Sequence, residues 1–177
     1  MRHCLLEATA IAITLVGCAS TPPVVIRGNL PTGAEIAIVS FRDCTIAKQE
    51  DCDGAGNIAG SIFARVFSSS SRFKAIPISR PVGPKESFSD DAAVALARSK
   101  GFKFVINGEV DEYYNVAPMT FRVDRAGVSI RLLRVDDGSV LAFFSQRKEA
   151  GSNLSTPDHL IEKMAEHVRD SLSHAGV

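Results

Sequence analysis

The sequence predicts an α/β domain in which a mixed β-sheet of about five strands is covered by three helices. Three observations point to this class. Short apolar runs rich in β-branched residues predict strands, segments with apolar residues at helical spacing predict helices, and the two kinds alternate before the last strands follow one another. The expected order is therefore β-α-β-α-β-β-β-α, which implies a mixed sheet.

A buried strand and a helix open this domain. Residues 34–41 (AEIAIVSF) form a short apolar run with β-branched residues, which predicts the strand. Residues 57–69 predict a helix with one wide apolar face, and Asn57 is its expected N-cap. The residues of that face are Ile58, Ile62, Phe63, Val66 and Phe67.

A second strand and a second helix follow. Residues 72–78 (RFKAIPI) alternate between apolar and polar side chains, and Pro77 favours a strand end or an edge position. After a loop rich in Pro, Gly and Ser, residues 91–100 predict a helix that is capped by Asp90 and stops at Gly101.

Three strands come next, over residues 102–114, 119–135 and 140–147, with a hairpin turn by composition at residues 136–139 (DDGS). The final helix begins with Pro157 at its first position, behind Ser155 or Thr156 as the cap. Its apolar residues form one continuous stripe that predicts a buried face: Leu160, Ile161, Met164, Val168 and Leu172.

Composition limits the kinds of partner. Lys plus Arg and Asp plus Glu both number 20, so the chain has no basic field that would attract nucleic acid. No second run of about 20 apolar residues follows residue 18, so we expect no membrane-spanning helix in the rest of the chain.

The N-terminus resembles a bacterial lipoprotein signal peptide. Residues 8–16 form a short apolar run. The four residues Leu15-Val16-Gly17-Cys18 at the end of this run are similar to a lipobox. Glu7 departs from the pattern, because a carboxylate is unusual at the start of the apolar run of a signal peptide. The resemblance implies cleavage between Gly17 and Cys18 and lipidation of Cys18. The alternative is an apolar helix start that happens to end in cysteine.

The resemblance also implies a domain organisation. Residues 1–17 would be the signal peptide, residues 18–33 the lipidated cysteine and a flexible tether rich in Pro, Gly and small polar residues, and residues 34–177 a single periplasmic domain. Ala19, rather than Asp, follows the lipidated cysteine, which favours sorting to the outer membrane.

Two further cysteines, Cys44 and Cys52, form an even pair in a compartment that permits disulfides. A disulfide between them is the favoured interpretation. Two free thiols remain an alternative, and so does a metal site, because Asp43, Asp51 and Asp53 lie in the same stretch. The mixture of soft and hard ligands matches no recognised zinc spacing.

The order of elements resembles the CsgG/LpoB/FlgO group of periplasmic lipoproteins, which is related in fold to the N-terminal domain of TolB. The segments that carry the likeness are IAIVSF, IAGSIFARVF with RFKAIPI, ALARSKGFKFVINGEV, and VSIRLLRVDDGSVLAFFSQRKEAG. The resemblance implies action through protein contacts, by activating cell-wall synthases, building flagellar accessory rings or forming export pores.

No catalytic motif stands out. His159 and His167 would lie two turns apart on the last helix, about 12 Å along its axis and too far for one metal ion. Glu109 and Asp111 share a strand face, where they suit acid/base work on glycans or simply a solvated strand end. The Gly54–Asn57 stretch offers backbone N–H groups to an anion, or is a plain loop into a helix. We therefore expect no enzyme activity, no cofactor and no metal.

One cluster suits a protein contact. Tyr113 and Tyr114, with Met119 and Phe121, flank the loop at residues 115–118, and aromatic residues and Met beside a polar rim are typical of contact patches. The alternative is that these four residues pack the edge of the core.

Together these interpretations predict an outer-membrane lipoprotein that faces the periplasm and acts as a non-catalytic adaptor for another envelope protein, which it would activate or help to assemble. A small ligand-binding protein or enzyme acting on peptidoglycan or lipid is the first alternative. A homo-oligomeric, ring-forming subunit of an envelope assembly is the second.

Overall fold

A computed structural model describes residues 24–45, 52–115, 123–151 and 155–175 of the chain. Its strands are β1 (Val25–Ile26), β2 (Ala34–Val39), β3 (Phe73–Ile78), β4 (Phe104–Tyr114), β5 (Arg125–Arg134) and β6 (Val140–Glu149). Its helices are α1 (Ala55–Ser68), α2 (Asp90–Ser99) and α3 (Pro157–His174).

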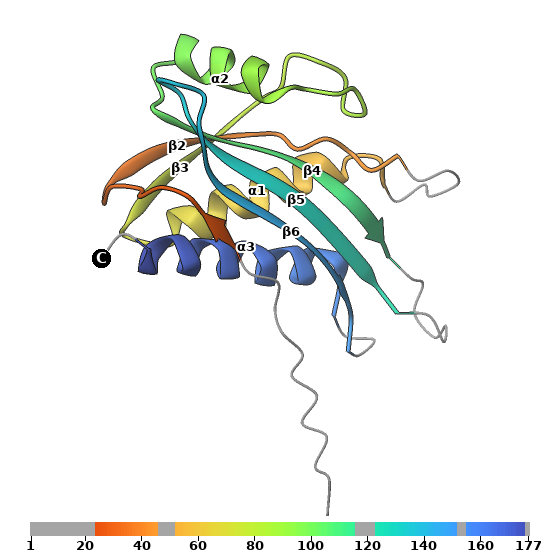
Figure 1. The fold of residues 1–177 in the computed structure, drawn as a ribbon. Helices are drawn as coiled ribbons and strands as arrows, with labels where there is room; N and C mark the ends of the chain where they lie inside the picture. The colour runs from red at the N-terminus through yellow and green to blue at the C-terminus, as the bar shows by residue number, and fades with distance from the viewer. Residues whose placement is uncertain (1–23, 46–51, 116–122, 152–154, 176–177) are drawn as a thin grey trace, which may run out of the picture.

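The six strands form one mixed sheet in the order β1-β6-β5-β4-β2-β3. β2 runs parallel to both β3 and β4, whereas β4, β5 and β6 are antiparallel neighbours. Helices α1 and α3 cover one face of the sheet, and α2 lies on the other face, above one end (Figure 1). The mixed sheet with three helices is thus confirmed, and β3 occupies the edge position that Pro77 favours.

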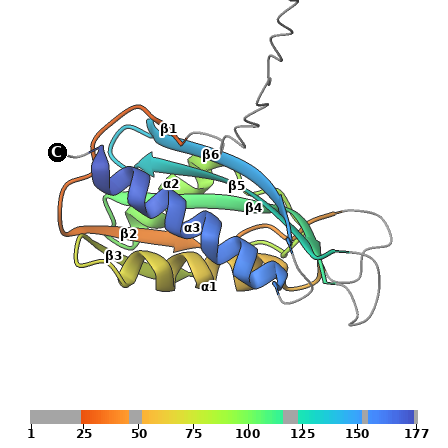
Figure 2. The same cartoon turned by 90° about the horizontal axis from the view of Figure 1, so that it is seen from below.

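The sheet has one strand more than expected. Val25 and Ile26 pair with Phe143 and Ala142 of β6, so β1 forms the edge strand seen beside β6 in Figure 2. Leu30 is buried as well. We expected a tether over residues 18–33, but from Val25 onward this segment packs on the domain. A two-residue strand is too short to show the alternation by which a strand is predicted.

The larger part of the core lies between the sheet and the pair α1 and α3. Phe41 and Phe63 meet there with ring centroids 5.1 Å apart, and the predicted stripe of the last helix is buried: Leu160, Ile161, Met164, Val168 and Leu172. A smaller cluster under α2 contains Ala37, Val105 and Leu133. The sheet is therefore apolar on both faces where helices cover it.

The helix starts differ from the prediction in two places. α1 begins at Ala55, and Gly54 takes the N-cap position with φ 85°, so Asn57 lies inside the helix rather than capping it. Ile58 is 37 % exposed and falls outside the buried face. The N-cap of α2 is Ser89, not Asp90, and its hydroxyl accepts the N–H of Ala92. Gly101 follows α2 with φ 83°, as expected for a helix stop.

Candidate functional site

Four of the expected functional residues, Gly17, Cys18, Met119 and Phe121, lie outside the described residues. The lipidation site and half of the aromatic cluster are therefore not placed. Within the four described ranges, no helix has the length and apolar character needed to cross a membrane.

Tyr113 and Tyr114 do not form one surface. Adjacent residues of a strand point to opposite faces, and Tyr113 is only 8 % exposed in the core on the α1 and α3 side. Its hydroxyl donates to Asp158 Oδ1 of α3 over 2.6 Å. Tyr114 is half-buried on the opposite face, where the guanidinium of Arg125 lies 5.2 Å from its ring centroid. The sheet thus separates the two tyrosines of the expected patch.

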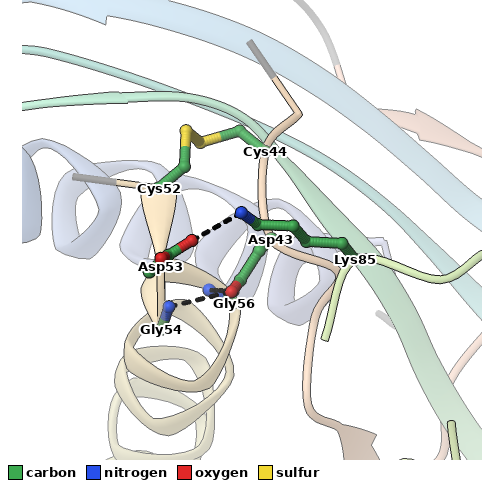
Figure 3. Close-up of a disulfide and its surroundings, with 7 residues drawn as sticks. All are labelled: Asp43, Cys44, Cys52, Asp53, Gly54, Gly56 and Lys85. Carbon is green, nitrogen blue, oxygen red and sulfur yellow. Dashed lines mark hydrogen bonds and ion pairs between the residues drawn. A yellow bond between two sulfur atoms is a disulfide. The ribbon is translucent and has the colours of Figure 1, made fainter. Parts of the chain in front are cut away.

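The cysteine segment closes the N-terminus of α1. Cys44 and Cys52 form a disulfide with their Cα atoms 5.2 Å apart, and both residues are buried (Figure 3). Next to it, the carboxylate of Asp43 accepts the N–H of Gly54 over 2.8 Å and the N–H of Gly56 over 2.6 Å. The anion that suits the Gly54–Asn57 stretch is therefore supplied by the chain itself.

The aspartates that suggested a metal site have other partners. Asp43 is 2 % exposed and is occupied by the two N–H groups. Asp53 forms an ion pair with Lys85 over 2.6 Å, as Figure 3 shows, and Asp51 lies outside the described residues. In the part of the chain that the structure describes, no three His, Cys, Asp or Glu side chains gather as metal ligands.

The carboxylates considered for acid/base chemistry lie on the face of the sheet that carries α2, beyond the end of that helix. Glu109 forms an ion pair with Arg42. Asp111 accepts the hydroxyl of Ser129 over 2.7 Å, and Ser129 is also hydrogen-bonded to Ser145. Both carboxylates are thus held by neighbouring side chains.

Exposed apolar side chains lie at both edges of this same face. Val25 of β1 and Phe143 of β6 stand directly opposite each other and are 44 % and 40 % exposed. Since Ala142 points into the α1 and α3 side of the core, Phe143 points to the other face. We call this pair the β1 edge patch.

The opposite edge is formed by β3. Ile76 is 41 % exposed there and pairs with Ala37, which belongs to the cluster under α2, so Ile76 lies on the same face as the β1 edge patch. For the edge formed by β1, the sequence signal was the short apolar run Val24-Val25-Ile26 within a segment otherwise typical of a tether. For Ile76 the signal was the alternation of its strand.

Comparison with known proteins supports the fold. No family model and no curated protein sequence matches the chain. A single-residue variant of the PelC dodecamer from Paraburkholderia phytofirmans is similar over 85 % of this chain and 95 % of that chain, with 21 % identity and a TM-score of 0.65. The lipoprotein GNA1162 from Neisseria meningitidis is similar over 80 % of this chain and 99 % of that chain, with 18 % identity and a TM-score of 0.51.

A third match is looser. The C-terminal domain of LpoB from Escherichia coli covers 71 % of this chain and 88 % of its own, with 12 % identity and a TM-score of 0.44, which is too low to carry a conclusion. At these identities PelC and GNA1162 establish a shared fold for nearly the whole domain, and no more than that.

Proposed function

We propose that this chain is a non-catalytic, lipid-anchored protein of the cell envelope whose folded domain associates with further copies of itself into a ring. The observation that carries this proposal is the likeness of almost the whole domain to a protein solved as a dodecamer. The likeness to a lipoprotein fits the lipid anchor that the N-terminal sequence predicts.

The exposed apolar side chains suit such an assembly. A ring is built from head-to-tail contacts, in which each subunit offers two different surfaces to its two neighbours. The β1 edge patch and Ile76 are exposed at the two opposite edges of the sheet and on the same face. A second copy that placed its β3 edge against the β1 edge patch would leave its own β1 edge patch free for a third copy.

The proposal that the protein is not a catalyst rests on the carboxylates of β4, which are bound by neighbouring side chains. Glu109 is paired with Arg42 and Asp111 accepts from Ser129, so neither stands ready as a free acid or base. The lipid anchor is proposed at Cys18, after cleavage of the signal peptide between Gly17 and Cys18. Ala19 favours sorting of the protein to the outer membrane, with the folded domain facing the periplasm. An anchor raises the concentration of the domain at one surface, which favours assembly there.

The anchor is tested by Cys18→Ala. We expect this variant to leave the membrane fraction and to appear in the soluble periplasmic fraction, whereas the unchanged chain pellets with outer membranes. If Cys18→Ala still pellets with outer membranes after a salt wash, the lipid anchor is wrong.

The ring is tested on the full chain extracted in non-ionic detergent, with the mass of the assembly measured by analytical ultracentrifugation. We expect the unchanged chain to form a closed oligomer and Phe143→Glu and Ile76→Glu each to abolish it. Ile58→Glu is the matched control, because Ile58 is an exposed isoleucine on α1, which covers the face of the sheet opposite to Ile76 and Phe143, and its replacement should leave the oligomer intact.

Mixing the two edge variants separates head-to-tail contacts from symmetric ones. Phe143→Glu retains an intact β3 edge and Ile76→Glu retains an intact β1 edge patch, so a head-to-tail contact allows one of each to form a heterodimer that grows no further. A monomeric unchanged chain would overturn the ring. It would favour the adaptor that binds a different envelope protein.

A further inference from the structure

A small pocket lies where the parallel strands β2 and β3 end, beside the start of α2. Its volume is about 220 Å³. The side chains that define its chemistry come from four separate segments, and they are Arg42, Arg80, Phe88, Asn107, Glu109 and Arg131. In open α/β sheets, ligands bind outside the carboxyl ends of parallel strands, which is the position of this pocket.

One of the three arginines that line the pocket is not held in an ion pair by the described residues. Arg42 is paired with Glu109, and Arg131 is paired with Asp90 over 2.7 Å. Arg80 lines the same pocket and forms no ion pair among the described residues, although the carboxylates of Asp43 and Glu86 lie near enough to favour its charge. Of the three guanidinium groups that line the pocket, two are held in ion pairs within the described ranges and that of Arg80 is not.

Arg80 is held in a position that disfavours its charge. Burial, and then the neighbouring charge of Arg42, lower the pKa of Arg80. Its guanidinium lies 5.7 Å from the centroid of the Phe88 ring and donates to the backbone carbonyl of Glu86. The buried Nε atoms of Arg42 and Arg80 have no hydrogen-bond partner in the part of the chain that the structure describes. An anion in the pocket would offset both the repulsion and the lost hydration.

The walls of the pocket are fixed before any ligand arrives. Asn107 is 3 % exposed, and its amide donates to the carbonyl of Phe88 and to Asp90 Oδ1. The backbone of Arg42 is hydrogen-bonded to β4 in both directions, through Gly108 and Val110. The disulfide and the Asp43 cap hold the residues that follow Arg42 (Figure 3). Such support keeps a binding group in place.

We propose that this pocket binds a small carboxylate ligand, with Arg80 as the group that recognises the negative charge. Arg80 is the arginine of the pocket that no ion pair holds among the described residues, and its planar guanidinium fork matches the two oxygens of a carboxylate. The volume is below the roughly 300–1,000 Å³ of pockets for drug-sized ligands, so the ligand is compact. This inference does not depend on the ring, because neither Val25, Phe143 nor Ile76 lines the pocket.

The test measures binding of acetate and of glucuronate to the full chain in non-ionic detergent by isothermal titration calorimetry. Ionic strength is held constant with sodium chloride, and glucose serves as the uncharged counterpart of glucuronate. We expect saturable binding of at least one carboxylate and no binding of glucose. Inorganic phosphate is titrated in the same way as a probe for tetrahedral anions.

Variants assign the binding to the pocket. We expect Arg80→Gln to weaken carboxylate binding about tenfold or more and Arg80→Lys, which retains the charge without the fork, to weaken it less. Arg147→Gln is the matched control, because Arg147 is exposed on β6 outside the pocket, and it should bind like the unchanged chain. Circular dichroism melting shows whether each variant is folded.

Three results would overturn the proposal. The first is an absence of saturable binding of both carboxylates, and the second is equal binding of glucuronate and glucose. The third is unchanged affinity in both Arg80 variants. Tight binding of phosphate with none of either carboxylate would replace the carboxylate assignment by a phosphate one.

Discussion

Asp43 Oδ1 accepts the backbone N–H of Gly56, a residue 13 positions later in the chain, over 2.6 Å. Asp43 Oδ2 accepts the N–H of Gly54 in the same way. The first N–H groups of a helix have no partner within it and carry a partial positive charge. A buried carboxylate from another segment thus caps α1, and the same segment carries Arg42 into the carboxylate pocket.

Replacing Asp43 by Ala should destabilise the fold. Two hydrogen bonds to a charged, buried group are lost and the helix N–H groups are left without partners, which costs about 2–3 kcal/mol of the free energy of unfolding. Equilibrium denaturation in urea measures this. Asp53→Ala is the control, since Asp53 is largely exposed and its loss should change little. Equal effects of the two replacements would contradict the capping role.

Replacing Gly56 by Ala should destabilise the fold for a steric reason. A Cβ atom at Gly56 would lie 2.0 Å from the backbone oxygen of Phe41, so α1 would have to move away from the end of β2. Overpacking of this kind costs about 1–3 kcal/mol. Gly151→Ala is the control, because none of the described residues has an atom within 4 Å of a Cβ there. Thermal melting of the two variants should separate them clearly, and equal melting temperatures would show that α1 adjusts without cost.

Removing the disulfide should lower stability by about 2–3 kcal/mol in the loop-entropy account, because Cys44 and Cys52 close a loop with a sequence separation of 8. The double variant Cys44→Ala/Cys52→Ala tests this by urea denaturation. Addition of dithiothreitol should destabilise the unchanged chain and leave the double variant as it was. An equal response of both proteins to the reductant would show that the disulfide is not the group affected.

The ion pair between α1 and α3 predicts a dependence on pH. The hydrogen bond from Arg65 lowers the pKa of Glu162 from its ordinary value near 4.5. A lowered pKa in the folded state means that ionised Glu162 stabilises the fold above the ordinary value. This stabilisation is lost as the pH falls through the lowered pKa. Arg65 is exposed and Glu162 is only partly buried, so solvent screens the pair and the effect is small.

The measurement compares the unchanged chain with Glu162→Gln by urea denaturation between pH 7 and pH 3. The difference in unfolding free energy should be present at pH 7 and disappear at the acid end. Glu149→Gln, at the exposed end of β6, is the control and should show no such convergence. A difference that persists unchanged at pH 3 would contradict the ion-pair explanation.

Local sequence predicted most elements of this fold because burial imposes a period on each one. The stripe from Leu160 to Leu172 predicted the buried face of α3, and Gly101 marked the end of α2. Pro77 pointed to an edge strand, and β3 is one. The prediction of lipidation at Cys18 rests on the sequence alone, because Cys18 lies outside the described residues.

The tertiary structure decided what depends on contacts between distant segments. It paired Val25 with Phe143, buried Tyr113 while leaving Tyr114 on the opposite face, and brought Arg42, Arg80 and Arg131 to one pocket. Periodicity reports which way a side chain points along its own element, but not which other segment it meets. Contacts between distant segments follow from strand order and register, which are set by the packing of the whole domain.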